Sequence, residues 1–220
     1  MNATADPSGS ELGNPLHQAL RRAYDESDRL LADPDGNRLE VVAWLSAHIA
    51  AFEHAIYPVV KRRVSDGAAL IENDRAIVTP LTRTLRMLER RHSGDTLAGG
   101  LSSDRLSSRL LALVQEHRDV QRQIIGALED SLDRAELDSL VRSYGDALAH
   151  APTRPHPYLH AGVMFRLDAL RDRILDTMDG RHVPLPRVRR PKIDPGRWGF
   201  YLLGQQQDRT AEPDDPRATA

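Results

Sequence analysis

The chain has 220 residues, of which 30 are basic, 32 acidic and nine histidine, and it contains no cysteine. The lack of cysteine excludes disulfides, iron–sulfur clusters and cysteine nucleophiles, so any bound metal must have nitrogen and oxygen ligands. The formal net charge of -2 gives none of the basic surface that nucleic-acid binding usually requires. We therefore expect no nucleic-acid partner.

Two further classes are not expected from the linear sequence. No stretch approaches the roughly 18 consecutive apolar residues that a membrane helix needs. The first residues, MNATADPSGSELGNP, lack the charged and apolar regions of a signal peptide. These features predict a cytoplasmic protein with no membrane partner.

Aromatic residues make up only 5% of the chain, and Leu, Ala, Arg and acidic residues dominate, a composition that favours helices. Asn14-Pro15 is a helix-start signal, Ser102 is a cap signal, and Pro80 is expected to kink the helix that contains it. Apolar residues recur at helical spacing in six segments. These are residues 15–31, 38–64, 69–92, 102–128, 135–150 and 159–178.

The short loops between the first four segments predict antiparallel neighbours, so we expect an all-α fold built on an up-down-up-down four-helix bundle over residues 15–130. Residues 131–204 are expected to form a C-terminal helical extension that ends in an apolar, aromatic docking segment at 198–203. Residues 1–14 and 205–220 are polar and are expected to be disordered.

Polar residues interrupt the apolar stripes of the predicted bundle. His48 lies between Leu45 and Phe52 at helical spacing, which points it into the bundle, and His117 and Gln121 follow Leu113 in the same way. Asp74 lies on the apolar stripe of the third helix, and His17 lies at the edge of the stripe of the first. Because burying a lone charged group is costly, these side chains must contact one another, water or a metal ion.

This pattern resembles the hemerythrin-like, or HHE cation-binding, family. The resemblance rests on a histidine early in the first helix, His48 followed by Tyr57-Pro58, and a histidine on the fourth helix. The segments PTRPHPYL, Asp179-Gly180-Arg181 and GRWGFYLLG are similar to extended members of the family from GC-rich bacteria. The resemblance covers about residues 15–204 and implies the up-down-up-down bundle.

The resemblance also implies a non-haem iron centre in the bundle core, with a small diatomic ligand such as O2 or NO as partner and a role in sensing or iron handling. In the family, two helices carry His-x-x-x-Glu, whose carboxylates bridge two irons. Here Phe52 and Gln121 occupy those two positions, and Asp74 stands where a histidine is usual. Two adjacent cations need anionic bridges, so we expect one metal ion, held by His17, His48, Asp74 and His117, with Glu53 as a fifth group.

Alternatives remain open. The same residues also suit a metal-free, hydrogen-bonded polar cluster in a degenerate bundle that serves as a protein-interaction or structural module. A third hypothesis is a redox enzyme such as a peroxide scavenger. The nucleotide-binding and hydrolase motifs GxxxxGK[ST], GxGxxG, GxSxG and HExxH are missing, so we expect a protein that is not an enzyme. Arg154 and His156 are expected to tie the last helix to the bundle.

Overall fold

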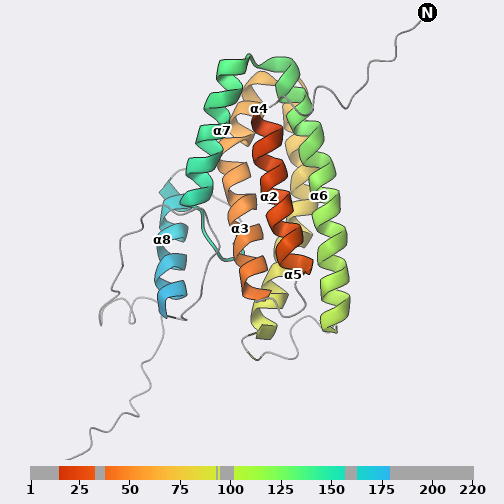
Figure 1. Cartoon of the computed structure of the whole chain (residues 1–220), viewed down its shortest axis with the longest axis vertical. Coiled ribbons are helices and arrows are strands. Elements are labelled where there is room, and N and C mark those ends of the chain that lie inside the picture. The colour runs from red at the N-terminus through yellow and green to blue at the C-terminus, as the bar shows by residue number, and fades with distance from the viewer. Residues whose placement is uncertain (1–14, 33–37, 93, 95–101, 157–162, 179–220) are drawn as a thin grey trace, which may run out of the picture. The chain divides into compact units, whose positions relative to one another are not determined.

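The computed structural model describes residues 15–32, 38–92, 94, 102–156 and 163–178, and within them all regular secondary structure is helical. This confirms the all-α prediction. The helices lie in one compact unit of the chain (Figure 1). They are α2 (Pro15–Ala32), α3 (Arg38–Ala55), α4 (Tyr57–Arg63), α5 (Gly67–His92), α6 (Ser103–Ser131), α7 (Arg134–Ala149) and α8 (Val163–Met178). The predicted terminal segments 1–14 and 205–220 and the docking segment 198–203 lie outside the described residues.

The predicted second helix is divided into α3 and α4 at Ile56. Pro58 lies in the first turn of α4, where its missing N–H costs least. A proline at this place cannot donate to the carbonyl four residues earlier, so the helix cannot pass through it unchanged. The amides of Val59 and Val60 instead both bond to the Ile56 carbonyl.

Gly67 sets the sharp return from α4 into α5. A Cβ atom at this position would lie 2.3 Å from the carbonyl oxygen of Val60, which no side chain tolerates. The glycine therefore permits the close approach of the two helices. The Ser102 cap is confirmed, because its side chain accepts a hydrogen bond from the Arg105 amide.

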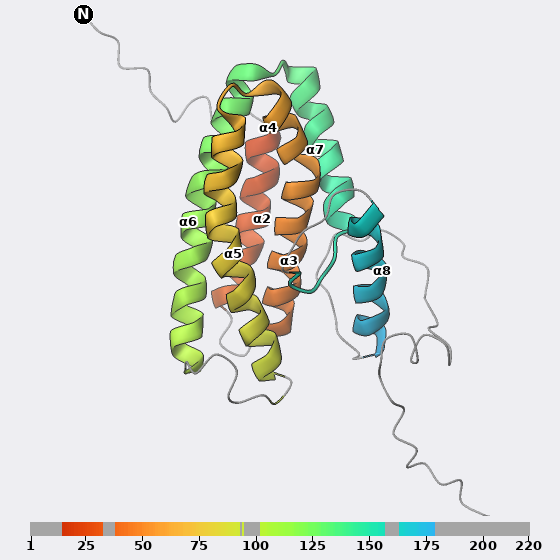
Figure 2. The ribbon, with the colours of Figure 1, turned by 180° about the vertical axis from the view of Figure 1, so that it is seen from behind.

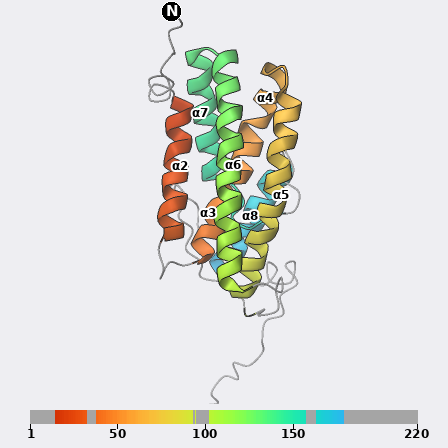
Figure 3. The same ribbon diagram turned by 90° about the vertical axis from the view of Figure 1, so that its right-hand side faces the viewer.

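Helix α3 is the central element of the core. Every residue from Val41 to Phe52 is buried, as expected of a helix surrounded by other helices. It packs against α2, α5 and α7, while α6 packs against α5 and α2. Figure 3 shows α6 between α2 and α5. The Trp44 indole N–H bonds to the Ala23 carbonyl and the Ser27 hydroxyl, which ties α3 to α2.

Helix α7 contributes side chains to the core of the bundle. It packs along both α3 and α2, and its Tyr144 side chain is only 3% exposed. The core thus receives side chains from α7 as well as from the helices of residues 15–130. Figure 2 shows α7 beside α3, with α8 further out.

The segment after α7 attaches α8, as predicted for Arg154 and His156. The Arg154 guanidinium lies 3.3 Å from Glu89 on α5 and 3.4 Å from Asp176 on α8. The buried carboxylate of Asp172 accepts from the amides of Thr153 and Arg154 and lies 3.0 Å from His156 Nε2. These contacts join residues 151–156 to α8.

One stretch, Arg38–Arg63, is long and apolar enough to cross a membrane, judged by length and composition over the described residues. However, 78% of its most apolar window is buried in the protein. A core helix of a soluble protein has the same features, so the absence of a membrane span stays a prediction.

Candidate functional site

Four polar side chains lie at the centre of the apolar core. The exposed fractions are 0% for Asp74 and Gln121, 1% for His48 and 3% for His117. The helical spacing that predicted their inward direction is therefore confirmed. Polar groups buried this deeply stabilise a fold only when they are hydrogen-bonded. These side chains belong to two hydrogen-bonded clusters.

The first hydrogen-bonded cluster is centred on His48. Its Nε2 atom lies 3.1 Å from Gln121 Oε1, and its Nδ1 atom lies 2.7 Å from the Tyr144 hydroxyl. Gln121 Oε1 also accepts a hydrogen bond from the Tyr24 hydroxyl. Because an amide oxygen only accepts, Nε2 of His48 carries the proton and Nδ1 accepts from Tyr144. His48 is thus held as a neutral imidazole in one tautomer.

Electrostatics favour the same protonation state. Burial, helped by the charge of His117, lowers the pKa of His48 to about 3. Burial also raises the pKa of Tyr24 and of Tyr144 well above the usual value. The two phenols therefore remain protonated donors, and the imidazole remains a neutral acceptor and donor.

The second hydrogen-bonded cluster is centred on Asp74. Its Oδ1 atom lies 2.8 Å from His117 Nδ1, and its Oδ2 atom accepts a hydrogen bond of 2.6 Å from the Tyr57 hydroxyl. Burial and the adjacent Asp74 carboxylate raise the pKa of Tyr57, so this phenol stays a donor. Both oxygens of the buried carboxylate are therefore satisfied.

Within the described part of the chain, two atoms of this cluster have no hydrogen-bond partner. They are His117 Nε2 and Gln121 Nε2, which lie one turn apart on α6. The His117 and His48 rings meet edge to face, with centroids 6.0 Å apart. We call the two hydrogen-bonded clusters together the core polar network. Its members are Tyr24, His48, Tyr57, Asp74, His117, Gln121 and Tyr144.

His17 is not part of this network. Its Nε2 atom lies 3.3 Å from Glu129 Oε1, and the two side chains are 18% and 27% exposed. The sequence placed His17 at the edge of a stripe, and a carboxylate on α6 provides its partner there. The structure thus brings together His48, Asp74 and His117 but not His17.

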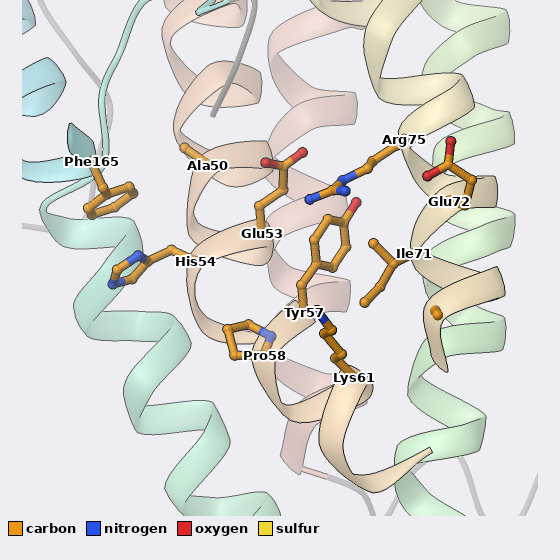
Figure 4. Close-up of a pocket in the computed structure, with 11 residues that line it drawn as sticks. Ala50, Glu53, His54, Tyr57, Pro58, Lys61, Ile71, Glu72, Arg75 and Phe165 are labelled. Atoms are coloured by element: carbon orange, nitrogen blue, oxygen red, sulfur yellow. The ribbon is translucent and has the colours of Figure 1, made fainter. Parts of the chain in front are cut away.

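Glu53 also lies apart, in a cavity of about 430 Å³. Figure 4 shows its carboxylate beside the guanidinium of Arg75 and above the ring of Tyr57. Burial raises the pKa of Glu53 to about 7, against the opposing charge of Arg75. Tyr57 lines this cavity and bonds to Asp74, so Glu53 borders the core polar network at this phenol.

The donor set does not fit a metal ion in this arrangement. The ring nitrogens of His48 and the oxygens of Asp74 are already hydrogen-bonded, which leaves His117 Nε2 as the one unengaged ligand atom of the predicted set inside the network. Over the described residues, no group of three or more histidine, aspartate or glutamate side chains is placed to hold a metal. A mononuclear site usually takes four ligands or more.

The tyrosines of the network were not predicted as site residues. The predicted ligand set contains only histidine and carboxylate residues, and Tyr57 enters the prediction only as part of Tyr57-Pro58. The available signal was chemical, since a tyrosine on a buried stripe must find a hydrogen-bond partner for its hydroxyl. Three such residues together with two inward histidines predict a network rather than isolated groups.

Comparison of the chain with models of protein families finds no match, and comparisons with curated proteins and with solved structures find no significant match. The hemerythrin-like resemblance therefore continues to rest on the residues themselves.

Proposed function

We propose that this protein is a hemerythrin-like up-down-up-down bundle whose ligand positions have become a metal-free hydrogen-bonded network, and that it acts as a binding or structural module rather than as an enzyme. The observation that carries this proposal is the closure of the network. Tyrosine hydroxyls and an amide oxygen engage the atoms of His48 and Asp74 that a metal ion would need. The bundle then keeps its polar core because nearly all hydrogen bonds of the network are made within the protein, with His117 Nε2 and Gln121 Nε2 as the exceptions in the described structure.

Several features of the chain support a non-catalytic role. Phe52 and Gln121 replace the bridging carboxylates that the family resemblance implies. Phe52 is 1% exposed and packs edge to face against Tyr57. It therefore fills with hydrocarbon the position where a bridge would stand.

The test is metal analysis of protein purified from iron-supplemented cells. We expect substoichiometric metal, with the same content in His117→Ala and in the matched control His92→Ala, which changes an exposed histidine at the end of α5. One metal ion per chain that is lost from His117→Ala and kept by His92→Ala would refute the proposal.

A second candidate is a mononuclear iron site anchored by His117. One observation favours it, because His117 donates Nδ1–H to Asp74 and leaves Nε2 unpartnered, which is the orientation of many metal-binding histidines. His48 would have to exchange its bond to Gln121 for the metal. Such an ion would supply a binding position for a small diatomic ligand, and the same metal analysis separates the two candidates.

A further inference from the structure

A second cavity, separate from the core polar network, is lined by residues of α7, α8 and α4 and by the C-terminal end of α3. It has a volume of about 800 Å³, within the range of sites for drug-sized ligands. Its charged lining consists of three arginines, Arg62, Arg166 and Arg173, and one carboxylate, Asp146. We call this cavity the cationic cleft.

The arginines of the cleft differ from Arg63 and Arg118, which have carboxylate partners. Arg63, next to Arg62 on α4, pairs with Glu136 at 2.6 Å, and Arg118 pairs with Asp28 at 2.6 Å. Among the described residues, no carboxylate lies within ion-pair distance of Arg62, Arg166 or Arg173. Counted with Asp146, the three guanidinium groups leave an excess of two positive charges in a chain whose formal net charge is -2.

One of these guanidinium groups is also partly removed from water. The Nε atom of Arg173 is buried and has no hydrogen-bond acceptor within the described structure. A buried donor of this kind is costly unless an acceptor reaches it. The side chain of Arg173 is thus held partly inside the wall of the cleft that it lines.

The cleft also has an aromatic and apolar wall. The His54 ring stacks on Phe165, with centroids 4.2 Å apart and an interplanar angle of 12°, and Figure 4 shows the two rings facing each other. Burial and the charge of Arg166 lower the pKa of His54, which keeps this ring neutral. Leu170, which is 45% exposed, and Leu140 add aliphatic surface.

We propose that the cationic cleft binds a small phosphorylated molecule with an aromatic or apolar body. Guanidinium groups present paired N–H donors that match phosphate oxygens, and the excess of two positive charges suits a phosphate dianion better than a single carboxylate. The stacked rings and leucines provide contacts for the body of the ligand. His150 lines the cleft as well, with Nδ1 bonded to the Asp146 carbonyl, so that Nε2 is the ring nitrogen left for a ligand.

The test is titration calorimetry on the full chain with three probes: ADP, pyrophosphate and adenosine. We expect ADP to bind more tightly than pyrophosphate and adenosine to bind weakest, because the charge and the wall both contribute. Binding of pyrophosphate as tight as that of ADP would assign the cleft to phosphate alone and overturn the amphipathic ligand. Lack of saturable binding of both ADP and pyrophosphate would overturn the whole proposal.

Variants locate the binding. Arg166→Gln and Arg173→Gln each should weaken ADP binding about tenfold, the loss expected for one charge-assisted contact. Arg109→Gln, which removes an exposed charge on α6, is the matched control and should change nothing. Equal weakening by all three variants would show that net charge alone attracts the probe, and would contradict the site.

A fourth variant tests the wall. Phe165→Ala should weaken ADP binding and leave pyrophosphate binding unchanged, whereas equal loss of both would indicate that α8 has detached. Thermal unfolding of each variant monitors folding. Metal analysis tests the core and probe binding tests the cleft, so the two proposals can fail separately.

Discussion

The core polar network and the cationic cleft differ in the burial and in the pairing of their ionisable groups. In the network, the histidine and carboxylate groups are fully buried, and tyrosine hydroxyls and an amide close nearly all of their hydrogen bonds. In the cleft, three arginines lie at the surface without carboxylate partners in the described structure. A closed network stabilises the fold and has little capacity left for a ligand, whereas an open set of charges retains that capacity. We therefore propose that the interior, which resembles a cofactor site, is the structural region and that the surface cleft is the binding region.

The largest effect is expected from removing the carboxylate of Asp74, which opens the network. Asp74→Ala removes the acceptor of both His117 Nδ1–H and the Tyr57 hydroxyl, and we expect it to lower the free energy of unfolding by about 3–5 kcal/mol, as for other broken buried pairs. Urea unfolding measures this.

The control for this variant is Asp138→Ala, whose carboxylate is 43% exposed and lies 3.5 Å from Arg134. Removing an exposed pair of this kind costs about 0.5 kcal/mol or less. If Asp74→Ala cost no more than the control, the network would not be the structural region.

The second test uses acid, because the folded protein holds His48 neutral. The pKa of this imidazole is about 3 in the folded state and about 6.5 in an unfolded chain. As the pH falls below about 6.5, His48 becomes protonated in the unfolded state but stays neutral in the folded state. The free energy of unfolding is therefore highest above that pH and declines toward pH 3. Between pH 7 and pH 4.5 we expect a loss of about 2–3 kcal/mol from this residue.

Denaturant midpoints measured across this pH range check the acid effect. His48→Gln should flatten the decline, and His92→Gln, at an exposed position, should leave it as in the wild type. A decline that persists in full in His48→Gln would assign the acid sensitivity to other groups.

The third test removes one hydroxyl from the network. Tyr144→Phe leaves His48 Nδ1 without its donor and should cost about 1–2 kcal/mol of stability. Ser143→Ala removes a neighbouring hydroxyl that bonds to the Ser139 carbonyl at an exposed place on α7, and it should be nearly neutral. Equal effects of the two variants in urea unfolding would show that the Tyr144 hydroxyl does not stabilise the core polar network.

The fourth and smallest effect concerns Glu53, which borders the network through Tyr57. Its pKa of about 7 in the folded state means that the unfolded chain loses this proton first as the pH rises above about 4.5. Stability is therefore lost between pH 4.5 and pH 7, and Glu53→Gln should be more stable than the wild type at pH 8 by on the order of 1 kcal/mol.

The two proteins should be equally stable at pH 4.5. Glu72→Gln, at an exposed position lining the same cavity, should show no such difference between the two pH values. A destabilised Glu53→Gln at pH 8 would mean that the carboxylate has a partner that stabilises its charged form.

Local spacing predicted much of the helical architecture. The predicted segments 15–31, 69–92, 102–128 and 135–150 agree with α2, α5, α6 and α7 to within a few residues, because apolar periodicity reports which face of each helix is buried. The division at Ile56 was not predicted, because residues 38–64 were expected to form one uninterrupted helix. Its cause is local, since the proline removes one backbone donor.

The candidate site was predictable only in part. The positions of His48, Asp74 and His117 follow from spacing within single helices, and the structure buries all three. The partner of His17 and the role of Tyr144 depend on which helices become neighbours, and sequence spacing holds no information on that packing. The cationic cleft was missed for the same reason, because its arginines come from α4 and α8, which are distant in sequence.

The most direct test of the closed network is the protonation of its two histidines, read from nitrogen-15 chemical shifts of the imidazole rings. The structure predicts that His48 is neutral with its proton on Nε2, that His117 carries a proton on Nδ1, and that the His48 signals stay unchanged from pH 8 to pH 5 and on addition of Zn2+ or Fe2+. Titration of His48 near pH 6.5, or a shift of His48 and His117 together at one equivalent of metal, would contradict the metal-free network.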